Sequence, residues 1–330
     1  MAHVVKFDRT GGPEVLELRE TETGEPGPGE LRIRVDAIGL NRAEVMFREG
    51  AYFYPPRCPS GLGYEAAGVV EAVGDGVTGF AVGDHVSVLP AFLQTEYGTY
   101  GDHILIPAAA TVHRPPDLAP EKAAAVWMAY LTAYGALVED GHLRPGDHVL
   151  ITAASGSVGL AAIQTARRIG AVPVATTRTP DKKERLLAAG AAHVIVTDEE
   201  DLPGRVKEIT DGRGVRTAFD PVAGPGVETL ADAIGPGGHL IVYGALDTRP
   251  TPLPRATEFP ALSTRTYAVF EITSDPGRLA RGVAFVDAGL ATGSVTPTLD
   301  RTFELKDIAD AHRYMEGNSQ VGKIVVTVPH

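Results

Sequence analysis

The first part of the chain alternates apolar and polar positions over short stretches, which are separated by turns rich in glycine and proline. In Leu31–Ala37 every second residue is apolar, and the residues between them are charged. A period of two residues is typical of strands that bury one face. We therefore predict a mainly β region with strands at Val4–Phe7, Leu16–Arg19 and Leu31–Ala37.

From Pro120 the pattern changes to an alanine-rich helix, predicted over Glu121–Val138, and then to strands that alternate with helices. Such alternation predicts a parallel sheet with right-handed crossovers and helices on both faces. The expected strands are Asp147–Thr152, Val172–Thr176, His193–Val196, Arg216–Asp220, His239–Tyr243 and Arg265–Phe270, and the expected helices begin near Gly156, Asp181, Asp201 and Gly224. A helix over Asp275–Ala288 and a strand over Lys323–Val328 are expected to return to the first region.

Composition narrows the class of protein. The chain has 330 residues, of which 44% are hydrophobic and 22% charged, as in ordinary folded proteins. Its net charge of −12 disfavours nucleic acid and anionic membrane surfaces as partners, and no apolar run is long enough for a membrane helix. The N-terminus lacks a signal-type apolar core, and the single cysteine, Cys58, cannot form an intramolecular disulfide. We expect a cytoplasmic protein that acts on a small-molecule substrate.

A glycine-containing loop follows the strand that ends at Thr152. Gly156 would let the main chain approach a pyrophosphate at the N-terminus of the next helix, and Gly159 would let that helix pack against the strand. The placement between a strand and a helix makes this a dinucleotide-binding loop, although its first glycine is replaced by Ala154. The expected cofactor contacts are Ala154, Ser155, Gly156, Ser157, Val158 and Gly159.

The end of the second strand indicates which dinucleotide binds. NAD sites usually carry an acidic residue there, which accepts a hydrogen bond from the ribose 2′-hydroxyl. This chain has Thr177 and Arg178 instead, with Lys182 and Lys183 shortly after. Basic side chains at this place favour a 2′-phosphate, so NADPH is the predicted cofactor. The alternative is that Arg178 and Lys183 are merely solvated at a helix start.

Several motifs together resemble the medium-chain dehydrogenase/reductase superfamily and, within it, the zinc-free quinone oxidoreductase group related to ζ-crystallin. They are Gly39-Leu-Asn-Arg-Ala-Glu44, Tyr54-Pro-Pro56, Gly63-Tyr-Glu-Ala-Ala-Gly-Val-Val70, Gly83-Asp-His-Val86, Gly98-Thr-Tyr-Gly101, Leu131-Thr-Ala-Tyr134, Ala153-Ala-Ser-Gly-Ser-Val-Gly159 and Gly322-Lys323. The resemblance implies an α/β protein in which a GroES-like, mainly β catalytic domain (1–123 and 271–330) is joined to a Rossmann domain with a doubly wound parallel sheet (124–270). It also implies a cleft where the nicotinamide meets the substrate, and a homodimer. The edge strand Arg265–Phe270 is the predicted pairing surface.

The resemblance also implies roles for single residues. Asn41 and Tyr54 would line the substrate side, Thr132 would lie near the nicotinamide, and Lys182 would meet the 2′-phosphate. Gly244 and Lys323 complete the expected cofactor contacts. Alternatives from the residues themselves stay open. Asn41 also fits the N-cap of a helix over Arg42–Arg48, Tyr54 could be a packed loop aromatic, and Tyr52 and Tyr64 are rival proton donors.

No metal site is expected. The zinc-dependent relatives place a cysteine where this chain has Asn41 and a histidine where it has Tyr64, and neither replacement offers a thiolate or an imidazole. Without a Lewis acid, reduction of a quinone or of a polarised C=C bond is easier than reduction of a simple ketone. The predicted function is NADPH-dependent reduction of quinones or α,β-unsaturated carbonyls. The alternatives are an enoyl-thioester (CoA- or carrier-bound) reductase and a cofactor-binding protein without significant turnover.

Overall fold

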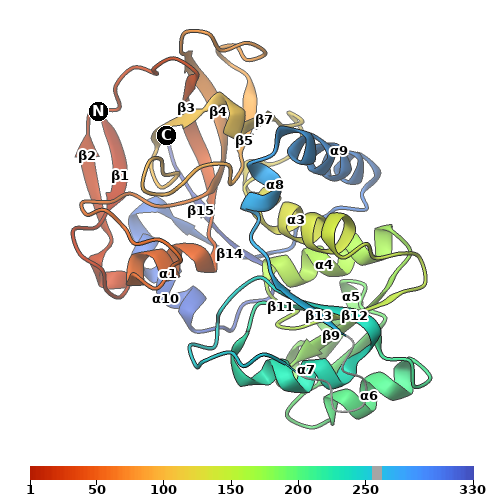
Figure 1. The fold of residues 1–330 in the computed structure, drawn as a ribbon. Helices are drawn as coiled ribbons and strands as arrows, with labels where there is room; N and C mark the ends of the chain where they lie inside the picture. Colours follow the sequence, from red (N-terminus) through yellow and green to blue (C-terminus); the bar gives the residue numbers. More distant parts are fainter. Residues whose placement is uncertain (255–261) are drawn as a thin grey trace. The chain divides into compact units, whose positions relative to one another are not determined.

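The computed structural model describes residues 1–254 and 262–330, which form two compact units (Figure 1). The first unit comprises Met1–Met128 and Pro297–His330, and the second comprises Ala129–Thr296. The second unit therefore includes residues 271–296, which the expected boundaries assign to the returning segment.

The first unit is built on an antiparallel-rich sheet of seven strands. Strand β3 (Glu30–Gly39) lies at its centre and pairs with β4 (Glu65–Val73), β6 (His103–Pro107) and β15 (Lys323–Thr327). The sheet continues through β5 (His85–Val88) to β7 (Thr111–His113) on one side and ends at β14 (Leu299–Glu304) on the other. Strands β1 (Ala2–Lys6) and β2 (Glu17–Thr21) form a separate hairpin, and the helices are α1 (Arg42–Glu49), α2 (Pro120–Ala123) and α10 (Ile308–Glu316), with short 3-10 turns at Pro13–Val15, Ala108–Ala110 and Leu305–Asp307.

Strand β3 follows the alternation seen in the sequence. Leu31, Ile33, Val35 and Ala37 are fully buried, while the charged residues between them are partly exposed. The predicted strand over Leu31–Ala37 is thus confirmed. The strands predicted at Val4–Phe7 and Leu16–Arg19 correspond to β1 and β2 and are confirmed to within a few residues.

The second unit contains a six-stranded sheet in which all described strands are parallel, in the order β10-β9-β8-β11-β12-β13. Because the chain order reverses between β9 and β11, β8 lies at the switch point where such sheets bind ligands. The strands are β8 (His148–Ile151), β9 (Val172–Thr177), β10 (His193–Val196), β11 (Val215–Asp220), β12 (Ile234–Val242) and β13 (Ser263–Thr266). The helices are α4 (Ser157–Arg168), α5 (Lys183–Ala188), α6 (Leu202–Ile209), α7 (Val227–Ala233), α8 (Phe270–Thr273) and α9 (Pro276–Thr292), with 3-10 turns at Pro180–Lys182 and Gly224–Gly226. The predicted Rossmann-type fold is confirmed.

Two predicted elements differ from the structure. The single helix expected over Glu121–Val138 is divided into α2, α3 (Trp127–Tyr134) and a π-helical turn over Gly135–Asp140. The strand expected over Arg265–Phe270 ends at Thr266, because the next residues turn inward: Tyr267 is buried, and Phe270 begins α8. The unpredicted elements include helix α10 and five strands of the first unit, which are β4, β5, β6, β7 and β14.

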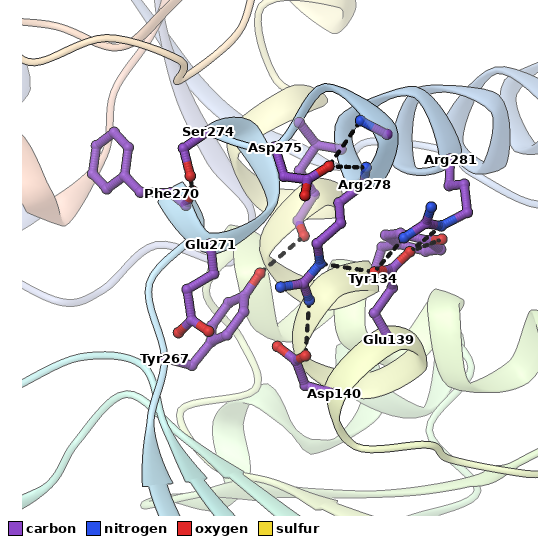
Figure 2. Close-up of polar contacts among 12 residues, drawn as sticks. Tyr134, Glu139, Asp140, Tyr267, Phe270, Glu271, Ser274, Asp275, Arg278 and Arg281 are labelled. Carbon is purple, nitrogen blue, oxygen red and sulfur yellow. Dashed lines mark hydrogen bonds and ion pairs between the residues drawn. The ribbon is translucent and has the colours of Figure 1, made fainter.

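Helix α9 is fastened to the π-helical turn, which explains its place in the second unit (Figure 2). The Arg278 guanidinium donates to Glu139 at 2.9 Å and to Asp140 at 2.8 Å, and Arg281 donates to Glu139 at 2.7 Å. Asp275, the N-cap residue, accepts from the first backbone N–H groups of the helix. These contacts tie α9 to α3 and the turn that follows it.

Candidate functional site

Asn41 stands between the end of β3 and the start of α1, and it is the N-cap residue of that helix. The Glu44 carboxylate accepts from the backbone N–H of Asn41 and, at 3.0 Å, from its side-chain amide. The same amide group donates to Gly39 O at 3.2 Å, and Asn41 Oδ1 accepts from Lys323 Nζ at 2.6 Å. The helix-capping position is thus confirmed, and both polar atoms of the side chain have protein partners.

Lys323 begins β15 and is buried in the first unit, with 1% of its side chain exposed. Its ammonium group forms an ion pair with Glu65, the first residue of β4, whose side chain is fully buried. The second carboxylate oxygen of Glu65 accepts from Met128 N at 3.1 Å. Lys323, predicted as a cofactor contact, thus lies between a carboxylate and the Asn41 amide.

The strand backbone leaves room for this ion pair only because residue 39 is glycine. A Cβ at Gly39 would lie 1.9 Å from Ala124 O, 2.8 Å from Lys323 Cε and 2.9 Å from Glu65 Cγ. A contact of 1.9 Å with a backbone oxygen cannot be relieved by a side-chain movement. The Gly39 of the quoted Gly39–Glu44 motif is therefore a packing requirement.

Glu44 also belongs to a series of buried, hydrogen-bonded side chains that includes Tyr100, His312 and Arg48. The Tyr100 hydroxyl donates to Glu44 at 3.0 Å and lies 3.1 Å from His312 Nε2, while Arg48 donates to His312 Nδ1 at 3.0 Å. Because an arginine can only donate, His312 carries its proton on Nε2 and donates to Tyr100. Burial, aided by Arg48 and Arg42, lowers the pKa of His312 to about 3, so this imidazole is neutral.

Burial raises the pKa of the Glu44 carboxyl to about 7, against the opposing effects of Lys323 and Asn41. Sequence reasoning missed Glu44, Glu65 and His312 as parts of the site. For Glu44 a signal was present, since a glutamate three residues after an N-cap asparagine is a capping-box pattern. Glu65 and His312 carry no comparable local signal.

The structure brings together the three tyrosines that the sequence left as rivals. Tyr54 Oη lies 2.5 Å from Tyr64 Oη, which in turn lies 3.2 Å from Tyr52 Oη. Gln94 N donates to the Tyr54 hydroxyl at 3.0 Å. Phe47 meets the Tyr54 ring edge to face, with ring centroids 5.5 Å apart. Tyr54 is therefore both a packed aromatic and a member of a hydroxyl cluster.

In the second unit, the glycine-containing loop runs from β8 into α4, and Gly156 is the N-cap residue. A Cβ at Gly159 would lie 2.6 Å from Ala154 Cα, so only glycine permits this approach of helix and loop. At Gly156 the nearest atom to a Cβ would be Ala153 O at 3.5 Å, an ordinary van der Waals distance, so packing within the protein does not require glycine there. This loop fits a dinucleotide pyrophosphate.

Asp220, at the end of β11, connects the neighbouring loops. Its carboxylate accepts from the Thr152 hydroxyl and, at 2.6 Å, from Ala223 N, and burial raises its pKa. At the end of β12, a Cβ at Gly244 would lie 2.7 Å from Pro221 O. The loops after β8, β11 and β12 are thus held close at the carboxyl edge of the sheet. Asp220 was not among the residues predicted for the site.

The remaining predicted residues also lie in the second unit. Thr177 ends β9, and its hydroxyl donates to Thr179 O at 3.0 Å. Arg178 is exposed, and Lys182 precedes α5 as its N-cap residue. Thr132, on α3, is buried.

Nowhere in 1–254 and 262–330 do three or more His, Cys, Asp or Glu side chains gather in a way that would hold a metal ion. No helix of these ranges has the length and apolar character needed to cross a membrane.

Family comparisons cover both units. Residues 27–116 match the family described as alcohol dehydrogenase GroES-like domain, and residues 157–275 match the family described as zinc-binding dehydrogenase. A quinone oxidoreductase of Pseudomonas aeruginosa is 40% identical over 244 residues, which are 74% of either chain. A 2-haloacrylate reductase of a Burkholderia species is 31% identical over 99% of both chains.

Two solved structures of related proteins are similar to this chain over nearly its whole length. The Escherichia coli quinone oxidoreductase complexed with NADPH superposes with a TM-score of 0.90 at 30% identity, covering 98% of this chain and 99% of the other. The CurK enoyl reductase superposes with a TM-score of 0.88 at 26% identity, covering 99% of each chain.

Proposed function

The chain belongs to the medium-chain dehydrogenase/reductase superfamily and to its quinone oxidoreductase group, and from this premise we propose that it is a zinc-independent, NADPH-dependent reductase of α,β-unsaturated carbonyls and quinones. The observation that carries the proposal is the Tyr54 hydroxyl, held by Gln94 N and the Tyr64 hydroxyl, which is a hydrogen-bond donor suited to an enolate oxygen without a metal.

The side chains at the two positions where the zinc-dependent relatives carry metal ligands do not fit a zinc ion. Asn41 Oδ1 already accepts from the Lys323 ammonium, so a divalent cation at this oxygen would have to displace a buried positive charge and would repel it. Tyr64 offers a phenol that is engaged with two other phenols. These residues do not fit the metal that one of the matched families is named after, and we assign it no role.

The cofactor is assigned to the second unit. The loop Ala154–Gly159 would bind the pyrophosphate through backbone N–H groups at the start of α4, and Gly244 would allow a close approach at the neighbouring strand. Thr177, Arg178 and Lys182 would receive the 2′-phosphate, and Thr132 would lie near the nicotinamide. When bound, NADPH supplies a hydride from nicotinamide C4.

The substrate oxygen is assigned to the first unit. As negative charge develops on this oxygen, Tyr54 would donate its hydrogen bond or its proton. Asn41 is assigned a positioning role, because its amide holds the Lys323 ammonium and the Glu44 carboxylate. Lys323, expected as a cofactor contact, has its ammonium group engaged by Glu65 and Asn41, and we assign it the same positioning role.

The test is a substrate panel that follows NADPH absorbance with quinones, enones and enoyl-CoA thioesters, together with elemental analysis. Turnover of enones and quinones with no stoichiometric zinc supports the proposal, whereas one tightly bound zinc per chain or no turnover of either class refutes it. Preference for enoyl-CoA would favour the alternative that the likeness to CurK enoyl reductase suggests. The panel also includes Tyr54→Phe, which should lower kcat on enones by about 10²–10⁴-fold while sparing NADPH affinity.

A homodimer is part of the proposal. Strand β13 pairs only with β12 among the described strands, and all four of its residues are exposed. An edge of this kind can pair with a second copy across a two-fold axis.

A further inference from the structure

Three tyrosine hydroxyls of the first unit form one hydrogen-bonded chain. It runs from Tyr52, which is partly buried, through the fully buried Tyr64 to Tyr54, which is partly exposed. Gln94 N donates to the Tyr54 end of the chain. The middle hydroxyl therefore contacts both of the others.

We propose that Tyr64 is a positioning residue that prepares the Tyr54 hydroxyl for donation and passes a proton to it as it donates, with Tyr52 as the entry point for protons. This inference rests on the proposed function of Tyr54 as the donor to the substrate oxygen. It assigns a role to a side chain at the position where the zinc-dependent relatives carry a metal ligand.

The directions of the hydrogen bonds explain how the chain would work. When Tyr64 donates to Tyr52, as the geometry of their hydroxyls has it, Tyr54 donates to Tyr64, and its proton is held inside the chain. When all three hydroxyls reverse, Tyr52 donates to Tyr64, Tyr64 donates to Tyr54, and the proton of Tyr54 points to the substrate. The Tyr54–Tyr64 bond fits either direction, whereas the Tyr64–Tyr52 bond has the geometry of donation by Tyr64, so the reversal also needs the Tyr52 hydroxyl to move.

In the reversed arrangement the Tyr54 oxygen accepts two hydrogen bonds, one from Gln94 N and one from Tyr64. Burial raises the pKa of Tyr54, and these two bonds oppose that rise because they stabilise the phenolate. During reduction of an enone, the Tyr54 O–H bond breaks and the proton passes to the enolate oxygen. In the same step Tyr64 gives its proton to the Tyr54 oxygen and Tyr52 gives its proton to Tyr64, so that no phenolate forms on the buried Tyr64, and solvent then restores Tyr52.

The rings around the chain keep the hydroxyls in place. Tyr52 and Tyr54 meet edge to face with centroids 5.0 Å apart, and Tyr64 packs on Phe92 with centroids 5.9 Å apart. The backbone N–H of Tyr64 donates to the buried Glu44 carboxylate at 3.3 Å, so its main chain is anchored to the network that also holds Asn41. A hydroxyl fixed in this way needs little reorganisation when charge develops beside it.

The experiment compares Tyr64→Phe with the parental protein, since phenylalanine keeps the ring and removes only the hydroxyl. Loss of one hydrogen bond to a developing phenolate should lower kcat on an enone by about tenfold to hundredfold. The KM for the enone and the affinity for NADPH should stay near the parental values. Quinone reduction, for which the acceptor is already strongly oxidising, should change little. The matched control is Tyr314→Phe. Tyr314 lies on α10, and its hydroxyl donates to Asp300 at 2.7 Å, so this variant also removes one hydrogen-bonded hydroxyl and should leave all rates unchanged.

A proton inventory in mixed H₂O and D₂O separates this role from mere packing. The parental rate on an enone should depend non-linearly on the deuterium fraction, because more than one proton moves, and Tyr64→Phe should make the dependence linear. Tyr52→Phe removes one of the transferred protons and should reduce the curvature, and this variant serves if Tyr64→Phe does not fold. An unchanged kcat and an unchanged inventory in either folded variant overturn the proposal.

Labelling the tyrosines with ¹³C at Cζ gives a readout that needs no turnover. The Tyr54 signal, identified by its loss in Tyr54→Phe, should shift in Tyr64→Phe and stay in place in Tyr314→Phe. If the parental protein reduces neither enones nor quinones while the Tyr54 signal shifts, the proposed function fails and the hydroxyl chain stands. If the signal does not shift, the chain itself is refuted, whatever the protein reduces.

Discussion

Replacing Lys323 with methionine should lower the free energy of unfolding of the first unit by about 3–5 kcal/mol, the usual result of removing one partner of a buried ion pair. Glu65 would keep only the hydrogen bond from Met128 N, and its negative charge would remain in a fully buried place. Asn41 Oδ1 would lose its donor as well. Methionine fills most of the volume of the lysine stem, so the loss reports the charge more than the packing.

The assay is a urea titration followed by tryptophan fluorescence. The chain has a single tryptophan, Trp127, which is buried and belongs to the first unit, so its signal reports unfolding of that unit. Adding Glu65→Gln to Lys323→Met removes the unpaired charge and should recover part of the lost stability. Lys306→Met, which breaks the exposed pair with Glu304, is the control and should leave the midpoint near the parental value. If Lys323→Met is no less stable than this control, the buried pair does not have the energetic role assigned to it.

Three further predictions follow from other parts of the chain. NADPH should bind at least about tenfold more tightly than NADH, a difference that corresponds to roughly one charged hydrogen bond. In a fluorescence titration, Arg178→Ala should weaken the binding of NADPH and leave that of NADH unchanged. Equal affinities for the two cofactors in the parental protein would contradict the assignment. Hydrogen bonds from Arg281, with those from Arg278 and Tyr134, lower the pKa of Glu139 to about 2 (Figure 2). The stabilisation of the folded state by the charged Glu139 is therefore complete above the ordinary glutamate pKa of about 4.3, and it disappears as the pH falls toward 2. The melting temperatures of the parental protein and of Glu139→Gln should differ at pH 7 and converge in acid. A difference that stays constant with pH would count against the ion pairs. Light scattering should give twice the 34.7 kDa of one chain, and a charge placed on β13, as in Thr266→Lys, should shift the particle toward one chain; a parental particle of 34.7 kDa would refute pairing through β13.

The sheet of the second unit was predictable because its signals are local. Each of its buried strands is a short apolar run, and residues with a recognisable capping function precede several helices: Gly156 before α4, Asp201 before α6 and Asp275 before α9. The glycine loop was predictable for the same reason, since the requirement at Gly159 arises from a residue only five positions away.

The π-helical turn was not predictable, because its cause lies far away in the sequence. A Cβ at Gly135 would lie 2.2 Å from the Tyr267 hydroxyl and 2.4 Å from Ile272, so the chain that follows β13 packs directly on this turn. A helix periodicity measured along Glu121–Val138 contains no information about that contact. The end of the predicted strand at Thr266 has the same origin, since Tyr267 turns in toward α3, where its hydroxyl meets Leu131 O at 3.5 Å.

The capping position of Asn41 follows from the end of β3, and the partners of its side chain follow from strand order. Residue 39 pairs with Glu65 on one side and with Val325 on the other, which brings the starts of β4 and β15 to the end of β3, where Asn41 follows. Neither pairing can be deduced from spacing, because 282 residues separate Asn41 from Lys323. Once the three ends meet, Asn41 Oδ1 accepts from Lys323, and the Asn41 amide group donates to Gly39 O and Glu44, so both polar atoms of the side chain have partners within the protein. For this reason we assign the hydrogen bond to the substrate oxygen to Tyr54, which is partly exposed and already accepts from a backbone N–H.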